Sequence, residues 1–363
     1  MPDIQGLIDG MTRDGSITRL ARNRAAQFGT RTRRLIGAEV LPARDVEENA
    51  FTDDTVRYRT VVANAGTRYS PVQLKSGALA GSVDVKLFDT DIGSELTSRE
   101  YDTLLRYLDR NQSMEAIASV VDFLDTTVVQ ALEELREVYR WQAIEKALIQ
   151  RRGHNGYKED IPLSDPVGHR VNAAGAWSNN AVDPMTDILA IKQMLINKGF
   201  AISRIVTGSK VMGILGLNDL MRTRAGAITV NVGGGLVVQG AAADQEKLAQ
   251  IFRANGLPAP EQYDLVYRTQ TGTARFISDN VMIFLGTTGR DVNFDVGQDT
   301  VEILPDTLGY TAVGRAAGQS APGRVVQAKF KDDKPPRIEA QGWETWSPVV
   351  TEPEAIAVIK AIA

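Results

Sequence analysis

Alternating apolar and polar residues predict two strands early in the chain. The segments TVRYRTVVA (Thr55–Ala63) and SVDVKLF (Ser82–Phe88) alternate with period two and contain β-branched residues, which is typical of strands. The 18 residues between them contain glycines and one proline, and a connection that long is uncommon in a compact domain. The pattern therefore predicts a long protruding hairpin.

The predicted hairpin carries apolar side chains for which the sequence offers no partner within one subunit. Exposed strand edges also invite pairing with another chain. We therefore expect the hairpin to lie across an adjacent subunit, with two basic residues meeting acidic groups there. The candidate inter-subunit contacts are Arg68, Tyr69, Val72, Leu74, Lys75 and Leu79.

Helical spacing follows the hairpin. Thr97 and Glu100 form a capping-box pattern, which marks the start of a helix. A second apolar stripe recurs every three or four residues, and no Gly or Pro interrupts it before Gly153. This pattern predicts one helix over residues 113–151, about 57 Å long, with Glu133 and Glu134 solvated on its outer face. A helix of this length suggests a strut across a flat, elongated molecule.

The second half of the chain alternates helices and short strands. Asp183 and Pro184 form a helix start, and Gly199 is expected to end that helix. AISRIVTG then predicts a strand, and Ser209 is expected to cap another helix. Short strands dominate from residue 228 onward, and Thr351 and Glu354 form a further capping-box pattern near the end. This half predicts a mixed α/β domain.

The first 60 residues differ from the rest, because their apolar residues are scattered. Between Arg13 and Arg34 the chain has seven arginines, one aspartate and no lysine, and an acidic stretch follows. The segment predicts an extended arm that lies on another surface, either nucleic acid or acidic groups of a neighbouring chain. The candidate arm contacts are Arg13, Arg19, Arg22, Arg24, Arg31, Arg33 and Arg34.

Composition limits the possible chemistry. The 363 residues are 43% hydrophobic and 24% charged, with a net charge of −4 and no cysteine. These values are ordinary for a globular protein and exclude disulfides, thiolate nucleophiles and a strongly cationic chain. No apolar run approaches the roughly 20 residues of a membrane span, and the first residues lack a signal-peptide core. We therefore expect a protein made and used in a cytoplasm, without a membrane partner.

No motif predicts a catalytic, cofactor or metal site. VGGGLVVQG (Val232–Gly240) lacks the lysine and spacing of a phosphate loop and predicts a turn between strands. The two histidines, His154 and His169, lie in a polar, glycine-rich stretch, which favours solvated loop residues. Asp279 favours a turn, and the tryptophans, Trp177 among them, favour packing.

The order of these parts resembles the major capsid protein of tailed bacteriophages, with its Hong-Kong-97-type fold. Trp177-Ser178, Asp183-Pro184-x-x-Asp187-Ile188, Gly199 and IVTGSKVMGIL are similar to a region of the lambda-type capsid protein E family. ARFISDNVMIFLG and WETWSPVVTEPEA are similar to later parts of that family. The resemblance covers most of the chain from about Leu41.

The resemblance implies an α+β fold with five parts. These are an N-terminal arm (1–54), an E-loop hairpin with flanking strands (55–92), a P domain with a spine helix (93–180, helix 113–151), an A domain with a mixed sheet (181–340) and a C-terminal return to the P domain (341–363). Some relatives crosslink a hairpin lysine to an asparagine; Lys75 and Lys86 lie in or near the hairpin, but no partner asparagine can be matched.

The resemblance also implies a function. It predicts a non-enzymatic head protein that forms hexamers and pentamers of an icosahedral shell around phage double-stranded DNA, bound without sequence specificity. Implied partners are other copies of the chain, a scaffolding protein, a portal protein and a decoration protein, and the implied place is the virion capsid, assembled in the bacterial host cytoplasm. An encapsulin-like compartment is the alternative with the same fold, and a cytoplasmic α/β enzyme is the alternative of another class.

Overall fold

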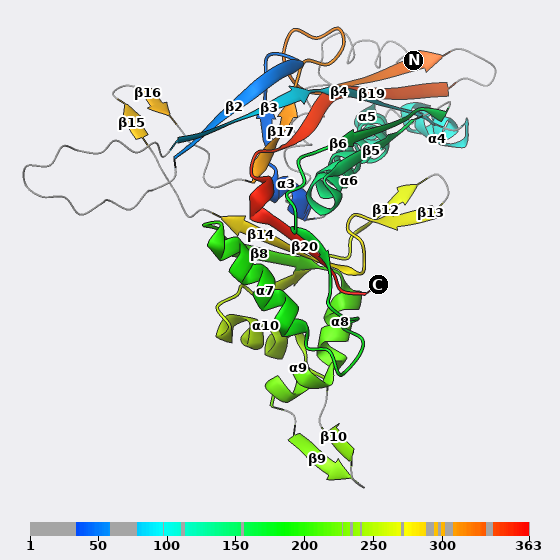
Figure 1. Ribbon diagram of the computed structural model, residues 1–363. Coiled ribbons are helices and arrows are strands. Elements are labelled where there is room, and N and C mark those ends of the chain that lie inside the picture. Colours follow the sequence, from blue (N-terminus) through cyan, green and yellow to red (C-terminus); the bar gives the residue numbers. More distant parts are fainter. Residues whose placement is uncertain are drawn as a thin grey trace, which may run out of the picture.

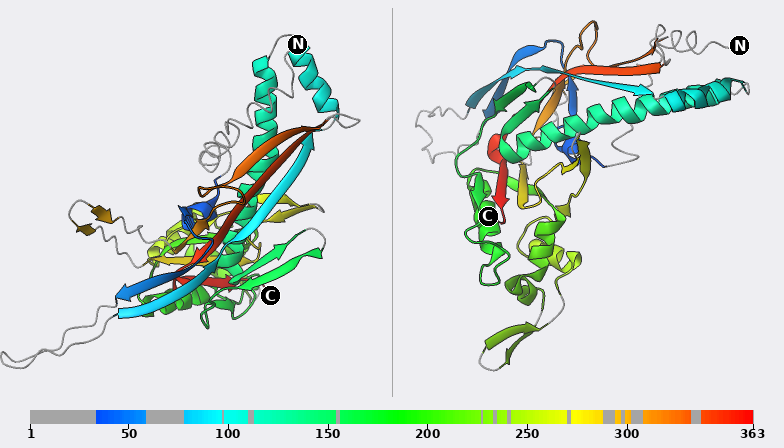
Figure 2. Two further views of the ribbon diagram at one scale, coloured as in Figure 1. Left: turned by 90° about the horizontal axis from the view of Figure 1, so that it is seen from above. Right: turned by 90° about the vertical axis from the view of Figure 1, so that its right-hand side faces the viewer.

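The computed structural model describes most of the chain from Arg34 onward. The described ranges are 34–58, 78–96, 98–109, 113–153, 156–226, 228–232, 235–239, 242–269, 272–287, 294–296, 299–301, 308–331 and 337–362. Figure 1 shows an upper layer, formed by a sheet with a long helix beneath it, and an α/β unit below that layer. Seen from the side, the long helix extends well beyond the α/β unit (Figure 2, right).

The upper sheet has five strands and is organised around β19 (Arg337–Val350). This strand pairs antiparallel with three others: β4 (Phe88–Leu96), β17 (Gly309–Val313) and β18 (Val325–Lys331). The short β1 (Ala43–Asp45) adds parallel to β17.

The predicted hairpin is confirmed as a pair of antiparallel strands, β2 (Ala50–Tyr58) and β3 (Ala78–Lys86). Both strands begin earlier in the sequence than their alternation suggested, and pairing continues to Tyr58 opposite Ala78. The hairpin runs out from one end of the upper sheet (Figure 2, left). Residues 59–77 lie outside the described part of the chain.

The predicted spine helix is present but ends earlier than expected. After α4 (Ser98–Asp109), the helix runs through α5 (Ser113–Leu124), a π-helical turn (Asp125–Val129) and α6 (Gln130–Lys146). Ala147 has a left-handed φ of 49°, and the next residues form β5 (Leu148–Arg152), paired with β6 (Lys158–Pro162). The prediction to residue 151 was wrong because the strand β5 follows the helix without a Gly or Pro to mark the boundary.

The spine helix lies against one face of the upper sheet. Leu124, Val128 and Leu132 of the helix share a buried cluster with Ile338 and Ala340 of β19. The apolar stripe read from the sequence is therefore the stripe that holds the helix to the sheet.

The lower unit contains a second five-stranded sheet. Its order is β11 (Pro260–Gln262), β8 (Ala201–Thr207), β14 (Val281–Thr287), β20 (Ile356–Lys360) and β7 (Arg170–Asn172). The helices of this unit are α7 (Pro184–Asn197), α8 (Ser209–Leu217), α9 (Asp219–Arg224) and α10 (Gln245–Ala254). The short α3 (Ile36–Val40) packs against α6.

Three small hairpins and one turn complete the described elements. The hairpins are β9 (Ile228–Val232) with β10 (Gly235–Gln239), β12 (Val266–Thr269) with β13 (Gly272–Arg275), and β15 (Phe294–Val296) with β16 (Asp299–Val301). A 3₁₀ turn occupies Pro353–Ala355. The β9–β10 pairing confirms that VGGGLVVQG joins strands.

Of the two predicted N-terminal helix caps, Asp183 is confirmed and Ser209 is not. Asp183 caps α7, because its Oδ1 accepts a bond from the Met185 backbone N–H at 3.1 Å, and Gly199 follows the helix at φ 89° as predicted. Ser209 is not a cap: Gly208 holds that position, and the Asp264 carboxylate accepts from the Ser209 N–H instead.

The C-terminal segment is a strand rather than the predicted helix. In addition, the predicted A-domain boundary at residue 340 does not coincide with the division between the two sheets. The apolar residues of β20 are buried between β14 and β7, and this tertiary pairing outweighs the local capping-box pattern. Strands β17 and β18 pair in the upper sheet although they precede residue 340, whereas β20, placed by prediction with the P domain, pairs in the lower one.

Candidate assembly surfaces

The base of the β2–β3 hairpin is fixed to the upper sheet by polar contacts. The Tyr310 hydroxyl of β17 donates to Asp53 Oδ2 at 2.5 Å, and the Arg44 guanidinium lies 5.0 Å from the centre of the Tyr310 ring. Burial, together with the bond to Asp53, raises the pKa of Tyr310, so the phenol remains a donor. The hairpin therefore leaves the sheet in a defined direction.

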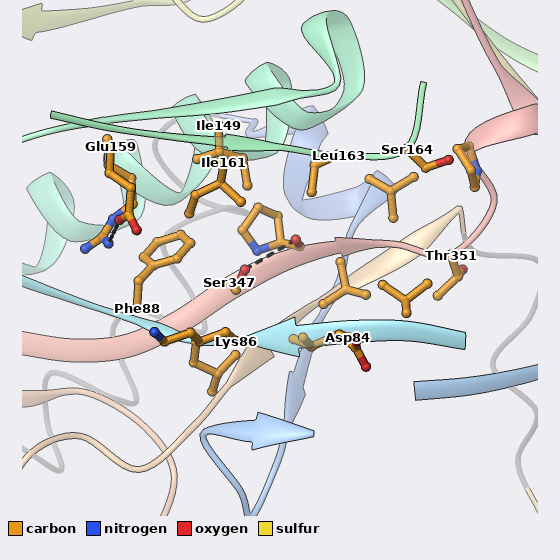
Figure 3. Close-up of a pocket in the computed structure, with 18 of the residues that line it drawn as sticks. Asp84, Lys86, Phe88, Ile149, Glu159, Ile161, Leu163, Ser164, Ser347 and Thr351 are labelled. Atoms are coloured by element: carbon orange, nitrogen blue, oxygen red, sulfur yellow. Dashed lines mark hydrogen bonds and ion pairs between the residues drawn. The ribbon is translucent and has the colours of Figure 1, made fainter. Parts of the chain in front are cut away.

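A groove of about 750 Å³ lies beside this base (Figure 3). One wall is β3, the opposite wall is the β5–β6 hairpin, and the end of β19 lies between them. Its apolar lining includes Val83, Val85, Ile149, Ile161, Leu163 and Val349. Such a lining suits apolar side chains of a ligand or partner.

The polar groups at one end of the groove bind one another. The Tyr157 hydroxyl donates to Glu159 Oε2 at 2.6 Å, and Arg151 forms an ion pair with the same carboxylate. The bond from Tyr157, followed by that from Arg151, lowers the pKa of Glu159. Arg151 also donates to the Asp89 carbonyl at 3.0 Å and stacks 4.5 Å from the Phe88 ring centre. Because Tyr157, Glu159 and Arg151 bind one another, we expect this end of the groove to bind a partner through its shape and apolar lining.

A buried ionic cluster joins the spine helix to the upper sheet. Arg324 Nη2 lies 2.6 Å from Glu133 Oε1, and its Nε donates to Glu344 Oε2 at 3.0 Å. Arg136 binds the two oxygens of Glu344 at 2.9 and 2.7 Å. The expectation that Glu133 is solvated was wrong, because the helix face that carries it is covered by β19 and by the residue that precedes β18.

Electrostatics explain how Glu133 remains ionised inside the protein. Burial by itself would raise its pKa, but the charges of Arg324, Arg136 and Arg140 outweigh burial and lower the pKa to about 2. Glu134, the neighbouring carboxylate, is partly exposed and accepts from the Gln130 side chain at 3.1 Å.

A second buried carboxylate joins three parts of the chain. Glu137 Oε1 accepts from the Gly37 N–H of α3 at 2.7 Å, the Trp141 indole at 2.7 Å and the Tyr263 hydroxyl at 2.8 Å. The spine helix, α3 within the predicted arm range and the α/β unit therefore meet at one side chain.

Of the predicted arm contacts, Arg34 lies within the described residues. Its guanidinium binds Glu39 at 2.7 Å and Glu261 at 2.8 Å, and Arg204 binds the same two carboxylates. Arg34 thus anchors the end of the arm to its own subunit, which the sequence pattern did not indicate. The other predicted arm contacts, Arg13 to Arg33, lie outside the described residues.

The predicted hairpin contacts are largely outside the described residues as well. Arg68, Tyr69, Val72, Leu74 and Lys75 belong to the segment 59–77. Leu79 lies in β3, with its backbone opposite Arg57 of β2. The structure therefore describes the base of the hairpin and leaves its contacts as predictions.

His169 was expected to be solvated, and this expectation was wrong. The side chain is fully buried: its Nδ1 lies 2.7 Å from the Ile356 carbonyl and its Nε2 lies 2.7 Å from Lys198 Nζ. Because a carbonyl only accepts, Nδ1 carries the proton and Nε2 accepts from Lys198. Burial lowers the pKa of His169, and the imidazole holds β20 beside α7. His154 lies outside the described residues.

Other predicted roles can be compared directly. Asp279 lies in a turn, and Trp177 and Trp346 are fully buried, as expected. Across the described ranges, no group of three or more His, Asp or Glu residues is arranged to hold a metal ion. None of the helices in those ranges is long and apolar enough to cross a membrane.

The fold is shared with solved structures, although no protein-family model matches the chain and no curated protein is significantly similar in sequence. A protein assigned as the capsid protein of an E. coli CFT073 prophage has a TM-score of 0.52 at 13% identity, over 79% of this chain and 82% of that one. A phage-related protein from Bordetella bronchiseptica RB50 has a TM-score of 0.50 at 11% identity, over 95% and 96%. An encapsulin complex from Synechococcus elongatus PCC 7942 has a TM-score of 0.42 at 13% identity, over 92% of this chain and 89% of that one.

The first two likenesses settle the architecture. The arrangement of hairpin, spine helix, upper sheet and α/β unit is the Hong-Kong-97-type capsid fold expected from the sequence.

Proposed function

We propose that this chain is the major head protein of a tailed bacteriophage or prophage. In this proposal its hexamers and pentamers tile an icosahedral shell around double-stranded DNA. The observation that carries the proposal is the fold shared with the prophage capsid protein over about four fifths of both chains, 79% and 82%. Repetition of one subunit by symmetry then makes every contact recur around the shell.

The role is structural rather than catalytic. In support, Tyr157, Glu159 and Arg151 at one end of the groove pair with one another, and the buried ionic cluster ties the helix to the sheet. A catalytic site would instead bring titratable groups together around an accessible space.

The hairpin beyond Tyr58 and Ala78 provides contacts with an adjacent subunit. Support comes from the rigid base at Asp53 and Tyr310 and from the way the strands run out from the sheet (Figure 2, left). Arg68 and Lys75 would meet acidic groups of the neighbour, and Tyr69, Val72, Leu74 and Leu79 would cover apolar surface there.

Further partners follow from the same role. They are a scaffolding protein, a portal protein and a decoration protein, and the packaged DNA is held without sequence specificity. With a net charge of −4, DNA is held by local basic segments. Assembly takes place in the host cytoplasm, and the product is the virion capsid.

Electron microscopy with light scattering tests the proposal. The chain is expressed alone and together with a candidate scaffolding protein from the same genome, and closed shells or capsomers are the expected result. A compact monomer under every condition contradicts the proposal. Particles from the natural host that hold long DNA support a phage head, whereas particles that hold only a protein cargo favour the encapsulin-like alternative.

A further inference from the structure

Strand β4 has an open edge along the upper sheet. It pairs with β19 over nine positions, from Phe88 opposite Trp346 to Leu96 opposite Ile338. On its other side, no strand within the described part of the chain pairs with it. At the Phe88 end the Asp89 carbonyl accepts from Arg151 at 3.0 Å, so the stretch of this edge that can accept a further strand runs from about Thr90 to Leu96.

The exposed face of β4 is acidic. Asp89, Asp91 and Glu95 alternate along the strand and point away from the spine helix, whereas Phe88 and Leu96 are buried on the helix side. Like charges on an edge strand exclude further acidic strands and favour a basic one.

Within the described residues, the cations beside these carboxylates lie at the two ends of the stripe: Arg151 donates to the Asp89 backbone carbonyl at 3.0 Å, and Arg337 lies beside Glu95. Asp89 accepts the Thr345 hydroxyl, and Glu95 lies 3.4 Å from Arg337, a guanidinium that also lies 3.3 Å from Glu339. The acidic stripe therefore keeps most of its attraction for a cationic partner.

The chain itself contains a segment of complementary charge. Residues 13–33 have six arginines and one aspartate. Arg22 and Arg24 are two residues apart, as are Arg31 and Arg33, and this spacing places each pair on one side of an extended strand. The spacing equals that of Asp89 and Asp91.

The position of Arg34 favours a neighbouring copy as the source of Arg31 and Arg33, the arm arginines next to the anchor. Arg34 is held by Glu39 and Glu261, and the following α3 packs on α6, on the helix side of the upper sheet. Residues 31–33 stay within about 10 Å of Arg34. The acidic stripe of the same subunit faces the opposite side of the sheet.

We propose that residues 13–33 of one copy add as an extended strand to the open edge of β4 in a neighbouring copy. Their arginines then lie over Asp89, Asp91 and Glu95. The inference rests on the proposed self-assembly and names the partner surface of the arm.

Disulfide trapping tests the pairing, because the chain has no cysteine of its own. Gly93→Cys places a thiol on the stripe, where the nearest atom to an added Cβ is the Ala340 carbonyl oxygen at 3.9 Å. Subunits with this change are co-assembled with size-tagged subunits carrying Asn23→Cys, Ala26→Cys or Thr32→Cys, and then oxidised. A mixed dimer is expected for at least one arm position, and Gly272→Cys on β13, also open to solvent, serves as the control without a dimer.

Charge exchange provides a second readout. Asp89→Lys with Asp91→Lys should reduce trapping about tenfold, and adding Arg22→Glu with Arg24→Glu or Arg31→Glu with Arg33→Glu should restore it. Raising salt from about 50 to about 500 mM should weaken the wild-type pairing. Glu246→Lys, an exposed change on α10, is the control that leaves trapping unchanged.

The outcomes separate the inference from the proposed function. Intact shells without a mixed dimer at any arm position overturn the inference and leave the function standing. A disulfide confined to single chains that carry both cysteines overturns the assignment to a neighbour. Loss of DNA content in arm variants, without any trapping, assigns the arm to nucleic acid and overturns the inference. If the wild-type chain forms no assembly, the proposed function fails.

Discussion

At the scale of single residues, the buried ionic cluster depends on Arg324. This side chain bridges Glu133 of the helix and Glu344 of β19, and both carboxylates are buried. Buried carboxylates that lose a partner are far more costly than exposed ones. Arg324 is therefore a joint between the spine helix and the upper sheet.

Replacing this joint should destabilise the subunit. Arg324→Met should lower the free energy of unfolding by about 3–5 kcal/mol, because two buried carboxylates lose a direct partner and keep Arg136 in contact and Arg140 farther away. Chemical denaturation of the unassembled subunit measures the change. Arg315→Met, at an exposed arginine in the same connection, is the matched control and should change stability by less than about 0.5 kcal/mol; equal effects would show that the cluster contributes little.

The contribution of Glu133 to the stability of the folded protein depends on pH. Its pKa is lowered from 4.5 to about 2 in the folded protein, so its contribution is complete above pH 4.5 and is lost as the pH falls from there towards 2. The stability difference between wild type and Glu133→Gln should stay constant from pH 7 to about 5 and shrink below that. Unfolding curves at several pH values measure it, and a difference that grows on acidification contradicts the assignment.

At the scale of elements, Gly342 marks the closest approach of the spine helix to β19. A Cβ at this position would lie 2.3 Å from Val128 Cγ1 and 3.3 Å from Leu132 Cδ1. Both residues are buried, so neither can turn away without disturbing the core.

A single methyl group added at Gly342 should weaken the packing of the spine helix against β19. Gly342→Ala should cost about 1–3 kcal/mol of unfolding free energy through overpacking, and Val128→Ala in the same chain should recover part of it. Gly93→Ala, on the neighbouring strand with 3.9 Å of clearance, is the control and should be nearly neutral. Thermal or chemical unfolding decides; equal costs would place the tight contact elsewhere.

Elements that depend on local patterns could be predicted from the sequence, whereas elements that depend on distant partners could not. Val128 and Leu132 lie on an apolar stripe that fixes the helix and its buried face, and Asp183 with Pro184 fixes the start of α7 by local bonding. The end of the spine helix and the strand β20 depend on distant partners, so their local patterns misled. Glu133, Arg136 and Arg140 follow helical spacing beside the stripe, and this was the one sequence signal of a buried cluster.

At the scale of the whole molecule, the hairpin and the body can be separated experimentally. Replacing residues 59–77 by a short turn containing Asn-Gly joins β2 and β3 directly after their last pair, Tyr58 and Ala78. The subunit should fold, since the contacts of Asp53 and Tyr310 remain, but closed shells should not form. Circular dichroism and electron microscopy report the two properties, and normal shells from the shortened chain would show that the hairpin is not a lattice contact.

The candidate surfaces were less predictable than the fold. The hairpin and the arm were identified by charge and by unsatisfied apolar residues, which are properties of the sequence. The groove beside Val83 and Leu163 and the anchor at Arg34 arise from segments far apart in the chain. Only the folded arrangement brings them together.

The place of β20 in the lower sheet has a consequence for synthesis of the protein. Ile356–Lys360 lies between β14 and β7, so the sheet is incomplete until these residues have left the ribosome. A nascent chain that stops before Ile356 leaves the facing edges of β14 and β7 unpaired and lacks the carbonyl that binds His169. We therefore expect chains truncated before Ile356 to fold less stably and to be cleaved more readily by proteases than chains that contain β20.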